Sequence, residues 1–177
     1  MRDIKARNGM VFAIRDEAES SRGGIDISEG AIVKSMDATI AFCDDNCGFA
    51  ESGDRIHLPH FGVDDIEIDG VEYATFRDSR LFFANGSPIN KYVLVRKCEE
   101  DHVRDESGEI ALYMTDKHIE TTNWCEVLEC ADDCQSMSNE YQGLFTPLVE
   151  SDERLARLGN SKDFCVHEDL IKFVTEG

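Results

Sequence analysis

The hydrophobic residues of this chain fall in short runs separated by polar turns, a pattern typical of β-strands. Runs rich in β-branched and aromatic residues occur at 10–17, 38–45, 76–84, 92–100, 124–133 and 165–174. Turn sequences such as "SGDR", "IDGVEY" and "LGNS" punctuate them. One segment, "DERLARLG", instead has the spacing of a helical turn or two. The pattern predicts an all-β protein built from short strands.

The runs form two series with the same order of features, which indicates an internal repeat. "MVFAIRDE" matches "YVLVRKCEE", and a polar segment with aliphatic residues beside glycine follows each, "RGGIDI" or "SGEIAL". "ATIAFCDD" then matches "WCEVLECADD", and "FRDSRLFFA" matches "CVHEDLIKFV". The separation grows from 81 residues (Arg15 to Arg96) to 89 (Leu81 to Leu170), as loop insertions would produce. The turn "ANGSPIN" marks the boundary and gives two units, 1–86 and 87–177, each the size of a small β-barrel or sandwich.

The chain is strongly acidic, with 37 Asp and Glu against 18 Lys and Arg and a formal net charge of −19. Such a surface repels phosphate backbones, so we expect no nucleic-acid binding. The longest apolar runs are too short to span a membrane, and "MRDIKARNGM" lacks the apolar core of a secretory signal. Seven cysteines, an odd number, argue against a complete disulfide framework. We therefore expect a cytoplasmic protein with free thiols.

Metal binding and catalysis receive little support from the motifs. Cys43 and Cys47, and then Cys125, Cys130 and Cys134, are spaced more widely than the pairs of a structural zinc site. Cys125 and Cys130 also differ in parity, so on a continuous strand they would face opposite sides. We interpret these residues as buried thiols and expect no metal. No phosphate-binding glycine loop, dinucleotide fingerprint or nucleophile elbow is present, so the protein is not expected to be an enzyme. Trp124, at the start of a strand, is expected in the core.

The ordered series resembles the small co-chaperonins, the GroES-like lids of GroEL-type chaperonins. In the first half the resemblance is carried by "GMVFAIRDE", "SSRGGIDI", "ATIAFCDD", "SGDRIHLPHFG" and "IEIDGVEYATFRDSRLFFA". The second, more divergent half is similar through "VLVRKCEE", "SGEIAL", "CEVLECADD" and "FCVHEDLIKFV". The resemblance implies two tandem GroES-like irregular β-barrels, each with a long mobile loop between its first two strands. We expect residues 17–34 and 99–117 to be mobile in the free protein.

In this family an aliphatic tripeptide of the mobile loop docks in a groove on the chaperonin. By position, the partner-binding residues implied here are Gly23, Gly24, Ile25, Asp26 and Ile27 in repeat 1, and Gly108, Ile110, Ala111 and Leu112 in repeat 2. Asp26 departs from the usual apolar middle residue. An extended segment can nevertheless bury Ile25 and Ile27 on one side and leave Asp26 in water. The alternative is that Ile25 and Ile27 belong to an ordinary hairpin packed on the barrel.

The resemblance implies a lid that caps a GroEL-type chaperonin and helps an enclosed client protein to fold. Such a lid has no cofactor of its own, because ATP is hydrolysed by the partner. The short "NCGFAE" connection predicts that repeat 1 lacks the family's roof hairpin.

In the family, neighbouring subunits pair their last and first strands to close a homo-oligomeric ring. Here the short connection predicts that "RLFFA" pairs with "INKYVLV", which leaves "GMVFAI" and "LIKFV" as open edges for ring closure. Two alternatives to the lid stay open: an acidic β-rich structural or assembly protein that keeps the fold without chaperonin binding, and a metal-binding module.

Overall fold

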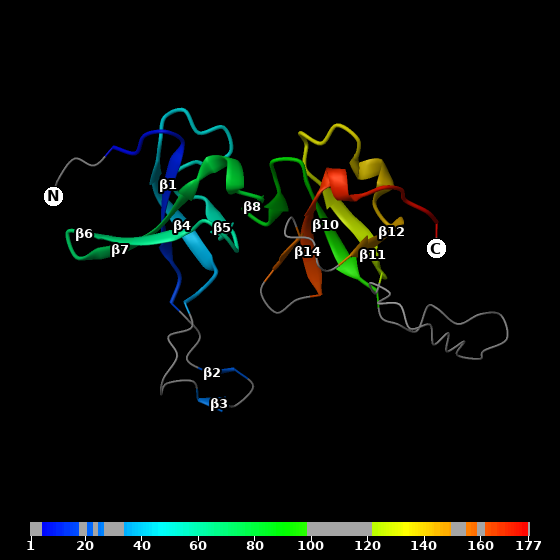
Figure 1. Ribbon diagram of the computed structural model, residues 1–177, viewed down its shortest axis with the longest axis horizontal. Helices are drawn as coiled ribbons and strands as arrows, with labels where there is room; N and C mark the ends of the chain where they lie inside the picture. The colour runs from blue at the N-terminus through cyan, green and yellow to red at the C-terminus, as the bar shows by residue number, and fades with distance from the viewer. Residues whose placement is uncertain are drawn as a thin grey trace, which may run out of the picture. The chain divides into compact units, whose positions relative to one another are not determined.

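The computed structural model describes residues 5–17, 21–22, 25–26, 34–98, 122–149, 155–158 and 162–176 (Figure 1). The chain forms two compact units, Met1–Asn90 and Lys91–Gly177. Both are built from antiparallel β-strands, and the described residues contain no α-helix of seven or more residues. The all-β prediction is therefore confirmed. In the described strands, neither sheet closes on itself by pairing its first strand with its last. None of the described helices is long and apolar enough to cross a membrane.

The first unit is a seven-stranded antiparallel sheet in which β1 is flanked by β7 and β4. The strand order is β6-β7-β1-β4-β5-β8-β9. The strands are β1 (Met10–Arg15), β4 (Asp37–Cys43), β5 (Arg55–His57), β6 (Asp64–Ile68), β7 (Val71–Arg77), β8 (Phe83–Ala84) and β9 (Ser87–Pro88). Asp69-Gly70 and Asn85-Gly86 have positive φ at both residues, the conformation of two-residue hairpin turns, so the chain reverses tightly at β6–β7 and β8–β9.

The second unit is a five-stranded antiparallel sheet with the same topology around its first strand. The order is β12-β11-β10-β14-β13. The strands are β10 (Tyr92–Lys97), β11 (Thr122–Cys130), β12 (Phe145–Val149), β13 (Leu155–Arg157) and β14 (Asp163–His167). In both units the first long strand lies between the next long strand, β4 or β11, and a late strand, β7 or β14. The two series of the sequence thus fold into two copies of one strand arrangement.

The repeat extends to a bulge at the same place in each copy. The register of β1 against β4 shifts between Phe12 and Ala13, and that of β10 against β11 shifts between Leu94 and Val95. A bulge adds one residue to a strand and increases its local twist. A shared irregularity of this kind is stronger evidence for a repeat than shared hydrophobicity, because most strands have no bulge.

The structure corrects the sequence alignment of the two copies by one residue. β1 and β10 have the same order of buried and less buried positions along their six residues. Met10 therefore corresponds to Tyr92, a separation of 82 residues. Arg15 then corresponds to Lys97 rather than to Arg96, because the earlier match aligned the arginines and ignored the burial pattern.

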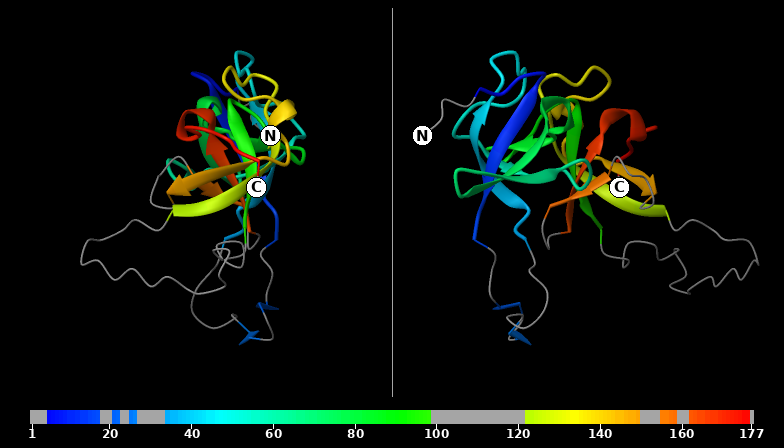
Figure 2. Two further views of the ribbon diagram at one scale, coloured as in Figure 1. Left: turned by 90° about the vertical axis from the view of Figure 1, so that its right-hand side faces the viewer. Right: turned by 60° about the vertical axis from the view of Figure 1, so that its left-hand side comes forward.

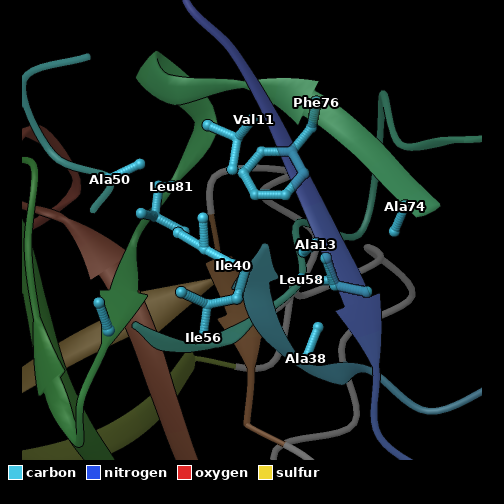
Figure 3. Packing of buried hydrophobic residues seen from close by; sticks show 11 residues of the cluster. Val11, Ala13, Ala38, Ile40, Ala50, Ile56, Leu58, Ala74, Phe76 and Leu81 are labelled. Carbon is cyan, nitrogen blue, oxygen red and sulfur yellow. The ribbon is translucent and has the colours of Figure 1, made fainter. Parts of the chain in front are cut away.

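Each unit has its own hydrophobic core. In the first, Val11, Ile40 and Phe76 meet between the strands, and Leu81 closes the cluster nearby (Figure 3). The second core holds the buried residues Val93, Val95, Cys125, Val127, Cys130, Met137, Leu148, Phe164 and Val166. Full burial of a large aliphatic or aromatic side chain contributes roughly 1.5–3 kcal/mol. Two separate clusters of this kind give each sheet its own source of stability.

The predicted pairing of "RLFFA" with "INKYVLV" is wrong. β8 pairs with β5 and β9, and both sides of β10 are occupied by β11 and β14. The reason is the turn at Asn85-Gly86, which folds β9 back onto β8 before the second unit begins. "GMVFAI" is likewise no open edge, since β1 is paired on both sides, and "LIKFV" is not a strand, although Thr175 just beyond it forms a bridge to Phe145.

Three local predictions are also corrected. Leu155–Arg157 of "DERLARLG" is strand β13, because pairing with β14 overrides the helical spacing. Cys125 and Cys130 are both buried in one core despite their different parity, because the bulge opposite Leu94 shifts the alternation of β11 by one residue. Trp124 is 38% exposed and packs edge-on against the ring of Phe173, so it lies outside the core.

Candidate functional site

The connection between β1 and β4 begins and ends at neighbouring points of the sheet, and hydrogen bonds join its two ends. β1 and β4 are antiparallel neighbours, so the end of one lies beside the start of the other (Figure 2). Beyond the last ladder pair, Asp16 N donates to Asp37 O at 2.8 Å. Arg15 Nη1 donates to Ser35 O at 2.7 Å. The connection therefore has a defined stem, and the candidate residues lie beyond it in the sequence.

An ion network fixes this stem to the β6–β7 hairpin. The guanidinium of Arg15 contacts Asp65 Oδ1 at 3.1 Å, and Lys34 Nζ lies 2.9 Å from Asp65 Oδ2 and also contacts Glu72. Partial burial acts to raise the pKa of Asp65, but the hydrogen bonds from Lys34 and Arg15 outweigh it and lower the pKa. The hydrogen bonds to Glu72 and Asp65 raise the pKa of Lys34. Arg15 belongs to β1 and Lys34 lies just before β4, so the stem is held from both of its strands.

The second unit closes the corresponding connection in the same way. Cys98 N donates to Trp124 O at 2.9 Å, which repeats the bond that closes the first stem. Next to it, Arg96 forms two hydrogen bonds to the carboxylate of Asp163, at 2.7 and 3.1 Å. This pairing raises the pKa of Arg96. Both repeats thus present a long connection, at residues 17–36 and 99–123, from a closed stem at the same point of the fold.

Most of the candidate docking residues lie outside the described residues. This applies to Gly23, Gly24, Ile27, Gly108, Ile110, Ala111 and Leu112. The expectation of mobility for 17–34 and 99–117 also falls largely outside them. The backbone of Ile25 and Asp26 forms β3, which pairs with β2 (Ser21–Arg22) in a two-stranded sheet of its own. Within the described residues, Ser21–Arg22 and Ile25–Asp26 therefore pair only with each other.

Two buried carboxylates that sequence reasoning missed organise the other end of each unit. Asp78, in the 3₁₀ turn η1 (Asp78–Arg80), accepts hydrogen bonds from the backbone N–H groups of Gly48, Phe49 and Ala50, the shortest at 2.8 Å. Its side chain secures the connection from β4 to β5. Residues 44–54 of that connection contain no strand, as expected for a repeat without a roof hairpin.

Glu168 repeats this arrangement in the second unit. It lies in the 3₁₀ turn η4 (Glu168–Leu170) and accepts from Gln135 N at 2.8 Å, and from Ser136 N and Oγ at 2.7 and 2.8 Å. We call Asp78 and Glu168 the carboxylate latches. The available sequence signal was the acidic residue that follows the late strand in both "FRDSR" and "VHEDL". The latch explains why the repeat keeps an acid at a buried position.

The Glu168 latch predicts a specific acid sensitivity. Burial acts to raise the pKa of Glu168, but hydrogen bonds from Ser136, Gln135 and Met137 outweigh it and lower the pKa. The stabilisation is therefore present above the unfolded-state pKa, about 4.3, and is lost as pH falls through the lower folded pKa. We expect Glu168→Gln to destabilise the protein at pH 7 and to differ progressively less from wild type below about pH 4. Urea denaturation at several pH values measures this, and a pH-independent difference would contradict it.

Three cysteines, Cys125, Cys130 and Cys165, are buried, and the other four are partly buried. All seven are free, and Cys43 Sγ donates to Ala50 O at 3.3 Å. Desolvation raises the pKa of Cys47 to about 12 and that of Cys134 to about 12. Within the described parts of the chain, no group of three or more His, Cys, Asp and Glu side chains could hold a metal ion. Cys125 and Cys130 lie in the second core, and Cys43, Cys47 and Cys134 pack against the cores of their units.

This arrangement predicts slow thiol modification. The thiolate is the reactive form, and burial keeps the thiols of Cys47, Cys130 and Cys134 protonated at pH 8. We expect the native protein to react with a maleimide or disulfide reagent much more slowly than the same protein in urea. Counting modified thiols against time by mass spectrometry checks this. Rapid labelling of Cys130 in the folded protein would contradict its buried placement.

His57 is a further buried polar residue with a defined partner. Its Nδ1 lies 2.9 Å from Asp37 Oδ1, and its ring packs edge-on against Phe82 and His60. Catalytic histidines need access to substrate. His57 is only 4% exposed, and its Nε2 is covered by surrounding atoms. His57 and Asp37 therefore help to pack the sheet and do not present a reactive group.

No protein-family model matches this chain, and no curated protein matches its sequence.

Proposed function

We propose that this protein is a co-chaperonin-like lid. In this proposal it docks on a GroEL-type chaperonin through the connections that leave the two stems and thereby assists the folding of an enclosed client. The barrel-like character implied by the sequence resemblance belongs to the same proposal. The lid carries no active site, and ATP acts on the partner ring. The ring-shaped assembly of several chains is a further part of the proposal.

The single observation that carries this proposal is the repeated stem. Both units have a long connection between corresponding strands, β1 and β4 in the first and β10 and β11 in the second. A backbone hydrogen bond closes each connection at the same point, from Asp16 N to Asp37 O and from Cys98 N to Trp124 O. Loops longer than about 12–15 residues are uncommon in compact domains and are usually functional. Their sequences place small aliphatic clusters, Ile25–Ile27 and Ile110–Leu112, beside glycine. A rigid unit that presents such a segment from a fixed base suits docking into an apolar groove.

The energetics favour several weak contacts rather than one strong one. Burying two aliphatic side chains of a loop contributes on the order of 3–6 kcal/mol, and ordering the loop offsets much of this gain. Each loop alone then binds weakly. Several loops on one particle bind well, because attachment of the first raises the effective concentration of the others. The duplication doubles the number of loops per chain, which serves this mode of binding.

The proposal is tested by co-elution of the purified protein with a GroEL-type ring. We expect the chain to elute with the ring in the presence of ATP or ADP and to elute separately without nucleotide. The ring alone and an authentic lid provide the reference positions. Separate elution under conditions where the authentic lid binds would overturn the proposal and favour an acidic assembly protein that keeps the fold without the partner.

A further inference from the structure

The first unit exposes an apolar surface on the side of its sheet that faces away from the core. Phe12 stacks on Phe42, with ring centroids 4.5 Å apart, and Tyr73 contacts both rings edge-on. Ile66 pairs directly with Tyr73 in register. Ile14 and Val71 lie on the same face, because side chains two residues apart along a strand point the same way. We call Phe12, Ile14, Phe42, Ile66, Val71 and Tyr73 the outer apolar face.

This face is too exposed to be a second core. Tyr73 at its centre is 7% exposed, but around it Ile14 is 44% exposed, Val71 38% and Ile66 36%. On the opposite side of the same strands, Val11, Ala13, Ala74 and Phe76 are at most 1% exposed. Contiguous exposed apolar residues on a folded protein mark an interaction surface more often than isolated ones do. Aromatic residues at its centre are the composition of a protein–protein interface.

The second unit shows that the fold does not require an apolar outer face. Arg96 occupies the position of Ile14, and its cross-strand neighbour Asp163 occupies that of Tyr73. These two residues form an ion pair at 2.7 Å. Glu129, paired with Leu94, occupies the position of Phe42. Leu94, at the position of Phe12, is apolar in both repeats, but at the other three positions the same backbone carries charge in one repeat and aromatic or aliphatic side chains in the other. The fold therefore does not require those three positions to be apolar.

The surrounding charges favour a second copy of this chain as the occupant. The chain as a whole carries −19, which makes two copies repel. At the rim of the outer apolar face, however, exposed charges of both signs lie close together: Asp64 is opposite Thr75 on β7, and Arg77 is two residues further along the same strand. Such a rim is self-complementary, because a two-fold axis can bring Arg77 of one copy to Asp64 of the other.

Pairing of sheet edges is a less favourable route to the same dimer. β6 is an edge strand, and its exposed residues include Asp64, Asp65 and Glu67. Two such edges would place like charges opposite each other, which is a common way in which proteins block edge pairing.

We infer that the protein self-associates face to face through the outer apolar face of its first unit. This association is independent of chaperonin docking, which the proposed function assigns to the connections between strands.

The test is the mass of the full chain by sedimentation equilibrium from about 1 to 100 µM, since dimerisation depends on concentration. We expect an even number of chains in the wild type. Ile14→Arg, which installs the residue of the second unit, should halve that mass and weaken association at least about tenfold. Ile66→Lys is a second variant at an exposed position of the same face. Phe61→Arg is the matched control, because Phe61 is 65% exposed and lies outside the strands, and it should leave the mass unchanged.

A cooperative thermal melt close to that of the wild type establishes that each variant is folded. A monomeric wild type at 100 µM would overturn the inference and leave the face to a different protein. An unchanged mass in a folded Ile14→Arg or Ile66→Lys variant would also overturn it, because the association would then use another surface. Neither result depends on whether the protein co-elutes with a chaperonin.

Discussion

Replacing Asp78 with alanine is expected to lower the free energy of unfolding of the first unit by about 3 kcal/mol. The substitution removes the acceptor of three backbone N–H groups, those of Gly48, Phe49 and Ala50. Ala50 N is buried and the N–H groups of Gly48 and Phe49 are part-buried. Leaving a buried donor without a partner costs about 1–3 kcal/mol, and bonds to a charged acceptor are at the upper end. The loss therefore belongs among the large effects of single substitutions. Urea denaturation followed by circular dichroism measures it.

The repeat supplies the matched experiments for this prediction. Glu168→Ala should destabilise the second unit by a similar amount, since Glu168 accepts from Gln135 and Ser136 in the same way. Asp78→Asn keeps one acceptor oxygen and should cost less than Asp78→Ala. Glu67→Ala, at an exposed position on β6, serves as the surface control. A loss below about 1 kcal/mol for Asp78→Ala would show that the connection from β4 to β5 does not depend on the latch.

Replacing Ile110 and Leu112 together with serine is expected to abolish co-elution with a GroEL-type ring while leaving the thermal melt nearly unchanged. The reason is that these side chains would be buried only in the complex. Each contributes on the order of 1.5–3 kcal/mol to docking, and the loss is multiplied across the loops of the particle. Co-elution with nucleotide and calorimetric melting of the free protein are the two measurements.

The matched variant in the first repeat is Ile25→Ser with Ile27→Ser. It should weaken co-elution less, because Asp26 interrupts the aliphatic tripeptide in that repeat. A drop in melting temperature for the Ile110 and Leu112 variant would place these side chains in the core of the second unit. That result would contradict the docking role even if binding were lost.

The sequence predicted the element type and the repeat well, because both depend on local patterns. The alternation in "MVFAIR" and "YVLVRK" alone defines β1 and β10, and their shared burial follows from it. Pairing partners were harder to predict. The neighbours of β10 come from strands 28 to 75 residues away, from Lys97↔Cys125 to Tyr92↔His167. The reversal of β9 onto β8 depends on the local geometry of Asn85-Gly86.

The remaining differences have equally specific causes. The hydrophobic pattern does not reveal the bulge in β11. Without it, Cys125 and Cys130 were expected on opposite faces of the strand, whereas both are buried. The exposed position of Trp124 reflects its place on the outer side of β11, which no local pattern distinguishes from the inner side. The latch residues were passed over because acidic residues are so abundant in this chain. The resemblance placed the two connections between the correct strands but not the contacts that close their stems, and the residues assigned to docking rest on the resemblance alone.

The most direct test of the lid proposal is electron microscopy of the protein mixed with a GroEL-type ring and nucleotide. The proposal predicts additional density that covers the end of the ring and contacts its apical domains, and that is absent with the Ile110→Ser and Leu112→Ser variant. Rings whose ends stay uncovered by the wild-type protein, in a preparation where an authentic lid covers them, would contradict it.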